Sequence, residues 1–491
     1  MKHHPVARTL VYSHRWLGIA GGVLVFVWFA SGIVMMYARM PVLESAERIA
    51  RLSPLDVSAL TVAPEAVAPD ATRLTVSTLG GRPVYRVIAA SKPRTIFADT
   101  GETLAPVSAD RAVELARAFS HGTDSAVRYD ARLEDADQWT FAVRGQMPLH
   151  RISLNDADDA RLYISERSGE VVMKTTAKGR RWGLLGAVLH WIHFTPFRRN
   201  AALWTQTIIW TSTAGVVMSI AGMLWGIWRY SPSRRYRLKR RPQRSPYAGL
   251  MQWHHYAGLI FGVTTITWLF SGLLSMEPWD WSPATAPTRE QRDGVSHGPF
   301  RTGDLTLASL KHAVAAYGSD PPREIEVVRF RGRYFLRAPA GIVSFDAPFR
   351  GPDASLHADE MLDAAREAMP GAAIDGVFWM DQYDSYYYDR TGRLSLPVLR
   401  VRYDDPQQTW LYLDPRRGAI ARKEERLSRI NRWIYHGLHS FDFPFLYYHR
   451  PLWDIVVIVL SLGGMLLSAT TLLPAWRRVR RRVRAMGRPR T

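Results

Sequence analysis

Four apolar stretches of this 491-residue chain are each long enough to cross a lipid bilayer. They run from Trp16 to Tyr37, Trp204 to Trp228, Tyr256 to Met276 and Trp453 to Leu473. A crossing needs about 20 apolar residues at a rise of about 1.5 Å each. Because lipid cannot satisfy backbone polar groups, we predict that all four stretches are transmembrane α-helices. "MMYARMPVLE" ends the first stretch without a small-residue cleavage site, so we expect it to be a permanent anchor.

The excess positive charge lies in three segments that contain no acidic residue. Residues 1–15 carry three Lys or Arg, residues 229–247 carry eight, and residues 476–491 carry eight. These 19 account for most of the net charge of +20, since the other 45 Lys and Arg face 44 Asp and Glu. If the spans alternate, all three segments lie on one side, as the positive-inside rule requires. We therefore expect a multi-pass membrane protein with both termini cytoplasmic, and no nucleic-acid partner.

Two long segments between the spans have nearly balanced charge and are predicted to lie in the periplasm. The first contains the alternating runs "GRPVYRVIAA" and "ARLYISERSGEVVMK" around the helical "SADRAVELARAF". The second contains "GRYFLRAPAGIVSFD", then "HADEMLDAAREAM", then "PVLRVRYDDPQQTWLYLDPRRGAIARK". The predicted organisation is N-terminus and first span 1–40, periplasmic module 41–181, His-bearing helix and second span 182–228, basic cytoplasmic loop 229–249, third span 250–276, periplasmic module 277–432, His-bearing helix and fourth span 433–475, and basic cytoplasmic tail 476–491.

The first and third spans are similar in sequence. "SHRWLGIAGGVLVFVWFASGIVMM", from Ser13, aligns without a gap with "WHHYAGLIFGVTTITWLFSGLLSM", from Trp253, and keeps His, Gly, Gly, Val, Trp, Ser, Gly and Met. The order of strands and helices also recurs in the two long segments. We therefore predict an integral membrane protein with four transmembrane α-helices in two parallel repeats, about 1–230 and 240–476, and two extracytoplasmic α/β modules.

Six histidines recur near the ends of the spans in both halves. Ionisable residues at membrane depth are costly and usually functional. Two imidazoles from matching positions can hold a flat iron porphyrin from both faces. By spacing alone, either the outer histidines or the inner histidines of the two H-x-x-H motifs can be matched with each other. The candidate ligands are His14, His254, His190 and His193 in "LHWIHFTPF", and His436 and His439 in "YHGLHSFDFPF".

The distance between the two histidine layers determines the number of cofactors. Twenty-two residues separate His14 from Met36, or roughly 33 Å of helix. One haem cannot reach both layers, so two b-type haems are expected. The chain has no cysteine, which excludes disulfides, thiolate-bound iron–sulfur clusters and c-type haem. Interfacial histidines, or a zinc site with further ligands, are the alternatives.

The pattern "HRWLG…W…SG" in the first span resembles the PepSY-associated transmembrane family, as does the turn in "SERSGEVVMK" ahead of "LHWIHF". The two long segments resemble PepSY-like modules. Members of this family include inner-membrane reductases of ferric siderophores that carry b-type haem. The resemblance implies a di-haem protein that takes electrons from a cytoplasmic or quinol donor and reduces a ferric siderophore or chelate in the periplasm. By position, His14, His254 and the two H-x-x-H motifs are the implied ligands.

The loop "MDQYDSYYYDRTG", from Met380, is a candidate docking surface for the chelate. Aromatic-rich loops of this kind are also typical of strand packing. Two other functional classes are compatible with the sequence, namely a haem-free PepSY membrane protein that regulates a periplasmic protease, and a transporter subunit. A b-type spectrum would distinguish the reductase from both. The candidate docking residues are Tyr383, Tyr386, Tyr387, Tyr388 and Arg390.

Overall fold

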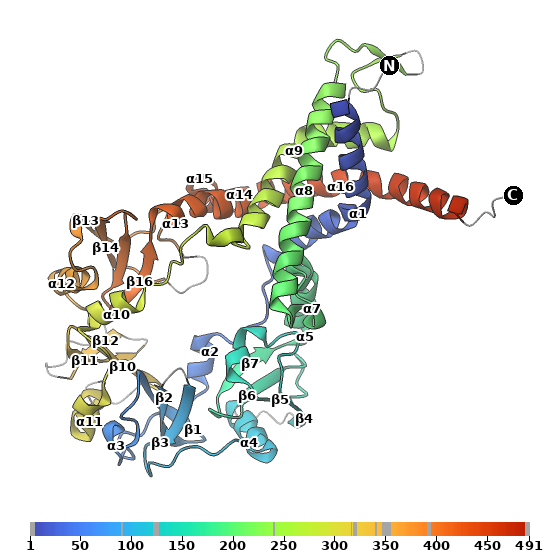
Figure 1. Cartoon of the computed structure of the whole chain (residues 1–491). Coiled ribbons are helices and arrows are strands. Elements are labelled where there is room, and N and C mark those ends of the chain that lie inside the picture. The colour runs from blue at the N-terminus through green and yellow to red at the C-terminus, as the bar shows by residue number, and fades with distance from the viewer. Residues whose placement is uncertain are drawn as a thin grey trace. The chain divides into compact units, whose positions relative to one another are not determined.

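The computed structural model describes residues 5–89, 92–120, 127–238, 241–315, 317, 322–338, 341–345, 355–389 and 394–486. Within these residues, four helices are long and apolar enough to cross a membrane, which confirms the four predicted spans. They are α1 (Pro5–Met35), α8 (Ala201–Arg229), α9 (Leu250–Leu274) and α16 (Leu452–Met486) (Figure 1). The chain is therefore a membrane protein that contacts the lipid bilayer. α16 continues past Pro474 into the basic tail, because arginine is a good helix former.

The chain divides into two compact units. The membrane unit comprises the described parts of residues 1–40, 181–282 and 430–491, and the second unit comprises those of 41–180 and 283–429. In the membrane unit, α1 and α9 each contact both α8 and α16. Small residues on α16 permit close packing, since a Cβ at Gly464 would lie 2.3 Å from the Phe29 ring and one at Gly463 would lie 2.3 Å from the Phe261 ring.

Short helices precede α8 and α16 in the same order. Each series includes a π-helical turn and a three-residue helix that ends at a left-handed residue, Ile192 (φ 53°) or Phe441 (φ 54°). The elements are α5 (Ala177–Gly183), η2 (Leu184–Val188), α6 (Leu189–Trp191) and α7 (Thr195–Arg198), then α13 (Arg426–Asn431), η5 (Arg432–Gly437), α14 (Leu438–Ser440) and α15 (Pro444–Tyr447). A short hairpin, β8 (Tyr236–Leu238) and β9 (Arg241–Gln243), follows α8.

The second unit contains a six-stranded antiparallel sheet built from both long segments. Its order is β12-β11-β10-β1-β2-β3. The strands are β1 (Arg73–Leu79), β2 (Arg82–Ala89), β3 (Lys92–Phe97), β10 (Ile325–Phe330), β11 (Arg333–Ala338) and β12 (Gly341–Ser344). β1 pairs with β10, Leu74 opposite Val327 and Val76 opposite Ile325, and all four side chains are buried in one core. The segments that the sequence presents as separate modules therefore share a sheet, because pairing covers an edge strand of each.

Two four-stranded antiparallel sheets complete this unit, one from each segment. The strands are β4 (Arg128–Leu133), β5 (Leu149–Ser153), β6 (Arg161–Ser165) and β7 (Val171–Thr175), and β13 (Ala373–Met380), β14 (Val398–Asp404), β15 (Trp410–Asp414) and β16 (Ala419–Glu424). Helix α4 (Ala109–Phe119) packs on the first sheet and α12 (Ala358–Ala368) on the second. The predicted Ser cap is present, since Ser108 Oγ accepts from the Arg111 N–H at 3.2 Å.

The remaining helical elements of the described chain are short. Helix α10 packs with α12 against the second four-stranded sheet, and α11 packs against the six-stranded sheet. They are α2 (Ser45–Ala50), α3 (Pro64–Val67), α10 (Arg289–Ser296), α11 (Leu307–Ala315), and the 3-10 turns η1 (Phe141–Gln146), η3 (Pro278–Asp280) and η4 (Thr302–Asp304).

Candidate functional site

One histidine pair lies between α1 and α9, near the N-terminal ends of both helices. The basic residues 1–15 and 229–247 lie at or before these ends. The Nε2 atoms of His14 and His254 are 3.5 Å apart, and the ring centroids are 5.7 Å apart. His14 Nδ1 lies 2.9 Å from the carbonyl oxygen of Met218, and His254 Nδ1 lies 3.1 Å from that of Leu467. A carbonyl can only accept, so Nδ1 carries the proton in each neutral ring and the Nε2 lone pairs face each other.

A glycine on α8 lets His14 approach closely. A Cβ at Gly222 would lie 2.4 Å from both Cε1 and Nδ1 of His14, closer than real contacts allow. By contrast, a Cβ at Gly21 would meet nothing within 4 Å. Gly222 is therefore required for the position of this imidazole, whereas Gly21 is not.

A second histidine pair lies at the other ends of α1 and α9. The ring centroids of His190 and His439 are 6.1 Å apart. Ser31 Oγ on α1 lies 3.2 Å from His190 Nδ1, and Ser271 Oγ on α9 lies 3.0 Å from His439 Nδ1. The Trp28 carbonyl oxygen lies 3.2 Å from the same His190 nitrogen. This pair is thus held through Nδ1 in the same way as the first pair.

Neither sequence-based pairing of the H-x-x-H motifs describes this arrangement. The structure pairs the first histidine of one motif, His190, with the second of the other, His439. His193 instead packs against Trp204 at 5.0 Å, and His436 against Tyr435 at 4.6 Å. The ring contact in the structure therefore joins an inner histidine of one motif to an outer histidine of the other.

The shared dipeptide Leu-His, at 189–190 and 438–439, is the signal that could have found this pair. Each dipeptide is followed two residues later by a left-handed residue. Each is also tied to the next long helix by an indole: Trp204 Nε1 donates to the Trp191 carbonyl and Trp453 Nε1 to the Ser440 carbonyl, both at 2.9 Å. All these positions match at a separation of 249 residues, whereas the H-x-x-H motifs match at 246.

The two pairs form separate layers. His14 and Ser31 are 17 residues apart on α1, which corresponds to about 25 Å of helix. His254 and Ser271 are also 17 residues apart on α9. A single porphyrin cannot contact imidazoles in both layers.

The donor set of His14 and His254 fits an ion that takes two protein nitrogens and its remaining ligands from a macrocycle. A metal–imidazole bond is about 2 Å long, so two bonds in line need about 4 Å between nitrogens. The separation of His14 Nε2 and His254 Nε2 is 3.5 Å. Across the described residues, no group of three or more His, Cys, Asp or Glu could hold a metal ion. A closed structural zinc site needs four protein ligands, whereas haem iron takes only its axial ligands from the protein.

The tyrosine loop contributes mainly to packing. Tyr387 is fully buried and stacks on Tyr412 with ring centroids 4.9 Å apart, and Tyr388 is also buried. This corrects the assignment of both residues to an exposed docking surface. Tyr383 is 38% exposed and donates to the Leu394 carbonyl at 2.7 Å. Tyr386 meets the Trp410 ring edge-on at 5.4 Å, and Arg390 lies outside the described residues.

A membrane protein with four spanning helices and paired histidines between them is the class that this geometry defines. A family model described as "PepSY-associated TM region" matches residues 11–332, which is more than half of the chain. The chain therefore belongs to the PepSY-associated transmembrane family, as the sequence motifs predicted. No curated protein matches the sequence.

Proposed function

We propose that this chain is a di-haem b electron-transfer protein of the bacterial inner membrane that reduces a ferric siderophore or another ferric chelate in the periplasm. The observation that carries the proposal is the presence of two imidazole pairs, with ring centroids 5.7 and 6.1 Å apart, in separate layers of one helical unit. Two neutral imidazoles with opposed nitrogens are a donor set for haem iron. Two layers about 25 Å apart on each helix suit transfer across a bilayer.

We further propose that the chain consists of two parallel repeats, each with a PepSY-like module, and that both termini lie in the cytoplasm. Three contacts support it, because each joins residues at matching positions of the two halves. They are His14 with His254, His190 with His439, and Thr75 opposite Glu326 between β1 and β10. Contacts between equivalent residues are typical of two-fold arrangements.

His14 and His254 would hold one haem, and His190 and His439 the other. Haem supplies a one-electron iron couple when bound. The Met218 and Leu467 carbonyls fix the tautomer of the first pair, as outer-shell partners of ligating histidines do. One electron from a cytoplasmic or quinol donor converts one chelated iron(III) to iron(II), which hard oxygen ligands bind weakly. The chain's own residues thus ligate, orient and exclude water.

Purified full-length protein tests this function directly. We expect two b-type haems per chain by pyridine haemochrome, a reduced-minus-oxidised b-type spectrum, and iron(II) trapped by ferrozine when a ferric chelate is added to the reduced protein. Absence of any b-type spectrum from protein supplied with haem would contradict the proposal. It would favour the haem-free protease regulator or the transporter subunit.

A further inference from the structure

The open face of the sheet β13–β16 carries a cluster of arginine and aromatic side chains. Strand residues alternate between faces. Leu399, Val401 and Leu411 point to the core with α12. Arg400, Arg402 and Trp410 belong to the opposite set, Arg402 directly opposite Trp410 and Arg400 opposite Tyr412. The arginine–tryptophan cluster comprises Phe378, Arg400, Arg402, Trp410 and Arg429, all within the second unit.

Three guanidinium groups converge on one indole ring. The Cζ atoms of Arg429, Arg402 and Arg400 lie 4.0, 4.4 and 5.3 Å from the Trp410 ring centroid. Arg402 and Arg400 also lie 4.5 and 4.8 Å from the Phe378 ring. Three like charges repel one another, so this arrangement costs free energy unless counter-charges compensate it.

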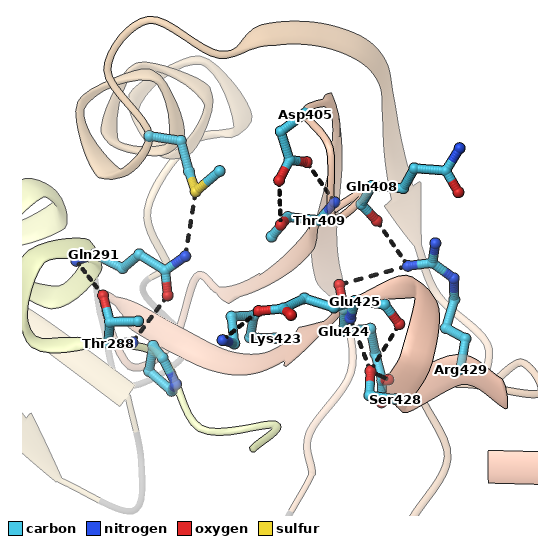
Figure 2. Close-up of polar contacts among 12 residues, drawn as sticks. Thr288, Gln291, Asp405, Gln408, Thr409, Lys423, Glu424, Glu425, Ser428 and Arg429 are labelled. Atoms are coloured by element: carbon cyan, nitrogen blue, oxygen red, sulfur yellow. Dashed lines mark hydrogen bonds and ion pairs between the residues drawn. The ribbon is translucent and has the colours of Figure 1, made fainter. Parts of the chain in front are cut away.

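The protein compensates this charge only in part. Arg400 Nη1 pairs with Asp384 Oδ2 at 2.5 Å. Arg429 Nη1 donates to a neutral acceptor, the Gln408 carbonyl, at 2.9 Å (Figure 2). Burial lowers the pKa of the Arg429 guanidinium, which the nearby Glu424 opposes.

Arg402 has no carboxylate partner among the described residues, and its Nε is buried without a hydrogen bond. The Glu424 carboxylate pairs with Arg422 at 2.5 Å. It also accepts from Ser428 (Figure 2). The cluster therefore holds three guanidinium groups against two carboxylates, Asp384 and Glu424, and Glu424 is shared with Arg422.

On the matching face of the first four-stranded sheet, the positive charge of the arginines is balanced in a different way. Arg151, opposite Tyr163, matches Arg400, opposite Tyr412. The next position on that face is Ser153, where the second sheet has Arg402.

Two carboxylates of the first sheet pair with arginines whose equivalents in the second, Arg400 and Arg429, have other partners. Asp130 pairs with Arg151 at 3.6 Å and accepts from Ser153 at 2.6 Å. It occupies a bulge of β4 between Tyr129 and Ala131. The bulge of β13 lies between Ile374 and Gly376, and its residue, Asp375, is exposed.

Asp159, the second of these carboxylates, pairs with Arg180. Gln408 occupies the matching turn position, and both residues have positive φ. On the same framework, the second face has Arg402 in place of Ser153, Trp410 in place of Arg161 and Glu424 in place of Thr175. The arginine therefore moves to the centre of the face, and the face has one carboxylate fewer. Packing alone does not require this change, which points to a ligand that supplies negative charge.

We propose that the arginine–tryptophan cluster binds an anionic, aromatic ferric chelate of the catecholate class. This rests on the proposed function and names its substrate class. Ferric catecholates are multiply anionic and present flat rings, which guanidinium groups and indoles stack against. Hydroxamate complexes are neutral or cationic and lack such rings. Phe378 is 39% exposed, so aromatic surface is available beside the guanidinium groups.

The test is a binding measurement on oxidised full-length protein, with no electron donor. The probe is an iron-59 complex of a hexadentate tricatecholate, in equilibrium dialysis, with ferric citrate and a ferric trihydroxamate compared. We expect Arg402→Ser, which installs the residue of the first sheet, to raise the Kd for the tricatecholate about 10- to 100-fold. Arg402→Lys should give a smaller rise, because charge remains without the planar fork. Arg161→Ser, on the matching face of the first half, should leave the Kd unchanged.

Two results would overturn the inference. One is an unchanged tricatecholate Kd in Arg402→Ser and Arg402→Lys proteins that melt at the wild-type temperature. The other is equal affinity of the wild type for all three chelates. Haem content is measured separately on the same samples. Haem-free protein that binds tricatecholate through Arg402 would contradict the proposed function alone, and haem-loaded protein without such binding would contradict the inference alone.

Discussion

The two halves of the chain agree at the histidine layers and differ on the open faces of the four-stranded sheets. His14 and His254 make equivalent contacts with Met218 and Leu467, carbonyls on matching helices. On the sheets, Ser153 of one half corresponds to Arg402 of the other. A site built where the halves meet needs both copies to keep the same residue. A site built on one half leaves the other free to remain a packed, neutral surface.

The largest effect on haem content should come from replacing one histidine of each H-x-x-H motif but not the other. We expect His190→Ala and His439→Ala each to remove one of the two haems, because both ligate the same iron. His193→Ala and His436→Ala are the matched controls and should keep two haems. Pyridine haemochrome gives haem per protein. Loss of haem in the controls with retention in the first two variants would reverse the assignment.

Truncation in the shared six-stranded sheet should destabilise both long segments between the spans together. Leu74 is fully buried opposite Val327, and Leu→Ala at such a site costs about 2–5 kcal/mol of unfolding free energy. Hydrogen exchange should rise in β10 and β11 as well as in β1 and β2. Val42→Ala, at a residue 48% exposed, is the control and should change stability by about 0.5 kcal/mol or less. Faster exchange confined to residues 41–180 would show that the segments are independent.

A methyl group at Gly222 should weaken haem binding by the pair of His14 and His254. It would meet His14 at 2.4 Å, and overpacking of this kind costs about 1–3 kcal/mol. We expect Gly222→Ala to lower the affinity for one haem about tenfold. Gly21→Ala adds the same methyl group to open space and should bind as the wild type does. Equal behaviour of the two variants would show that Gly222 does not position His14.

The smallest effect should come from the serines behind the other pair. Ser31 and Ser271 contact His190 Nδ1 and His439 Nδ1. A hydrogen bond is worth about 0.5–1.5 kcal/mol, or about 20–60 mV for a one-electron couple. We expect Ser31→Ala and Ser271→Ala each to shift the potential of one haem by this amount and to retain both haems. Redox titration measures it, and a shift in the other haem would contradict the assignment of the layers.

The spans and the first histidine pair could be predicted because both depend on local signals. An apolar run of spanning length has few alternatives, and the ungapped alignment of the first and third spans brings His14 and His254 into register. The second pair could not be predicted, because the H-x-x-H motif is a more obvious pattern than the Leu-His dipeptide. It is the dipeptide that aligns His190 with His439. Choosing between them requires the contacts of Ser31 and Ser271 across the bundle.

The shared six-stranded sheet and the arginine–tryptophan cluster also could not be predicted from the sequence. Alternation predicts β1 and β10 as strands, but not that they pair across about 250 residues, since edge partners depend on tertiary packing. The arginines of the cluster look like ordinary surface charge in the sequence. Only the register of Arg402 opposite Trp410, with Arg429 on the same ring, shows that they converge.

The most direct test of the account is a double-mutant cycle on His14 and His254, measured as haem per protein. Because one iron would share both imidazoles, His14→Ala and His254→Ala should each leave one haem, and the double variant should also leave one. The effects would be strongly non-additive. Retention of two haems with unchanged potentials in both single variants would contradict the shared-iron account and leave the matched histidines as packing residues.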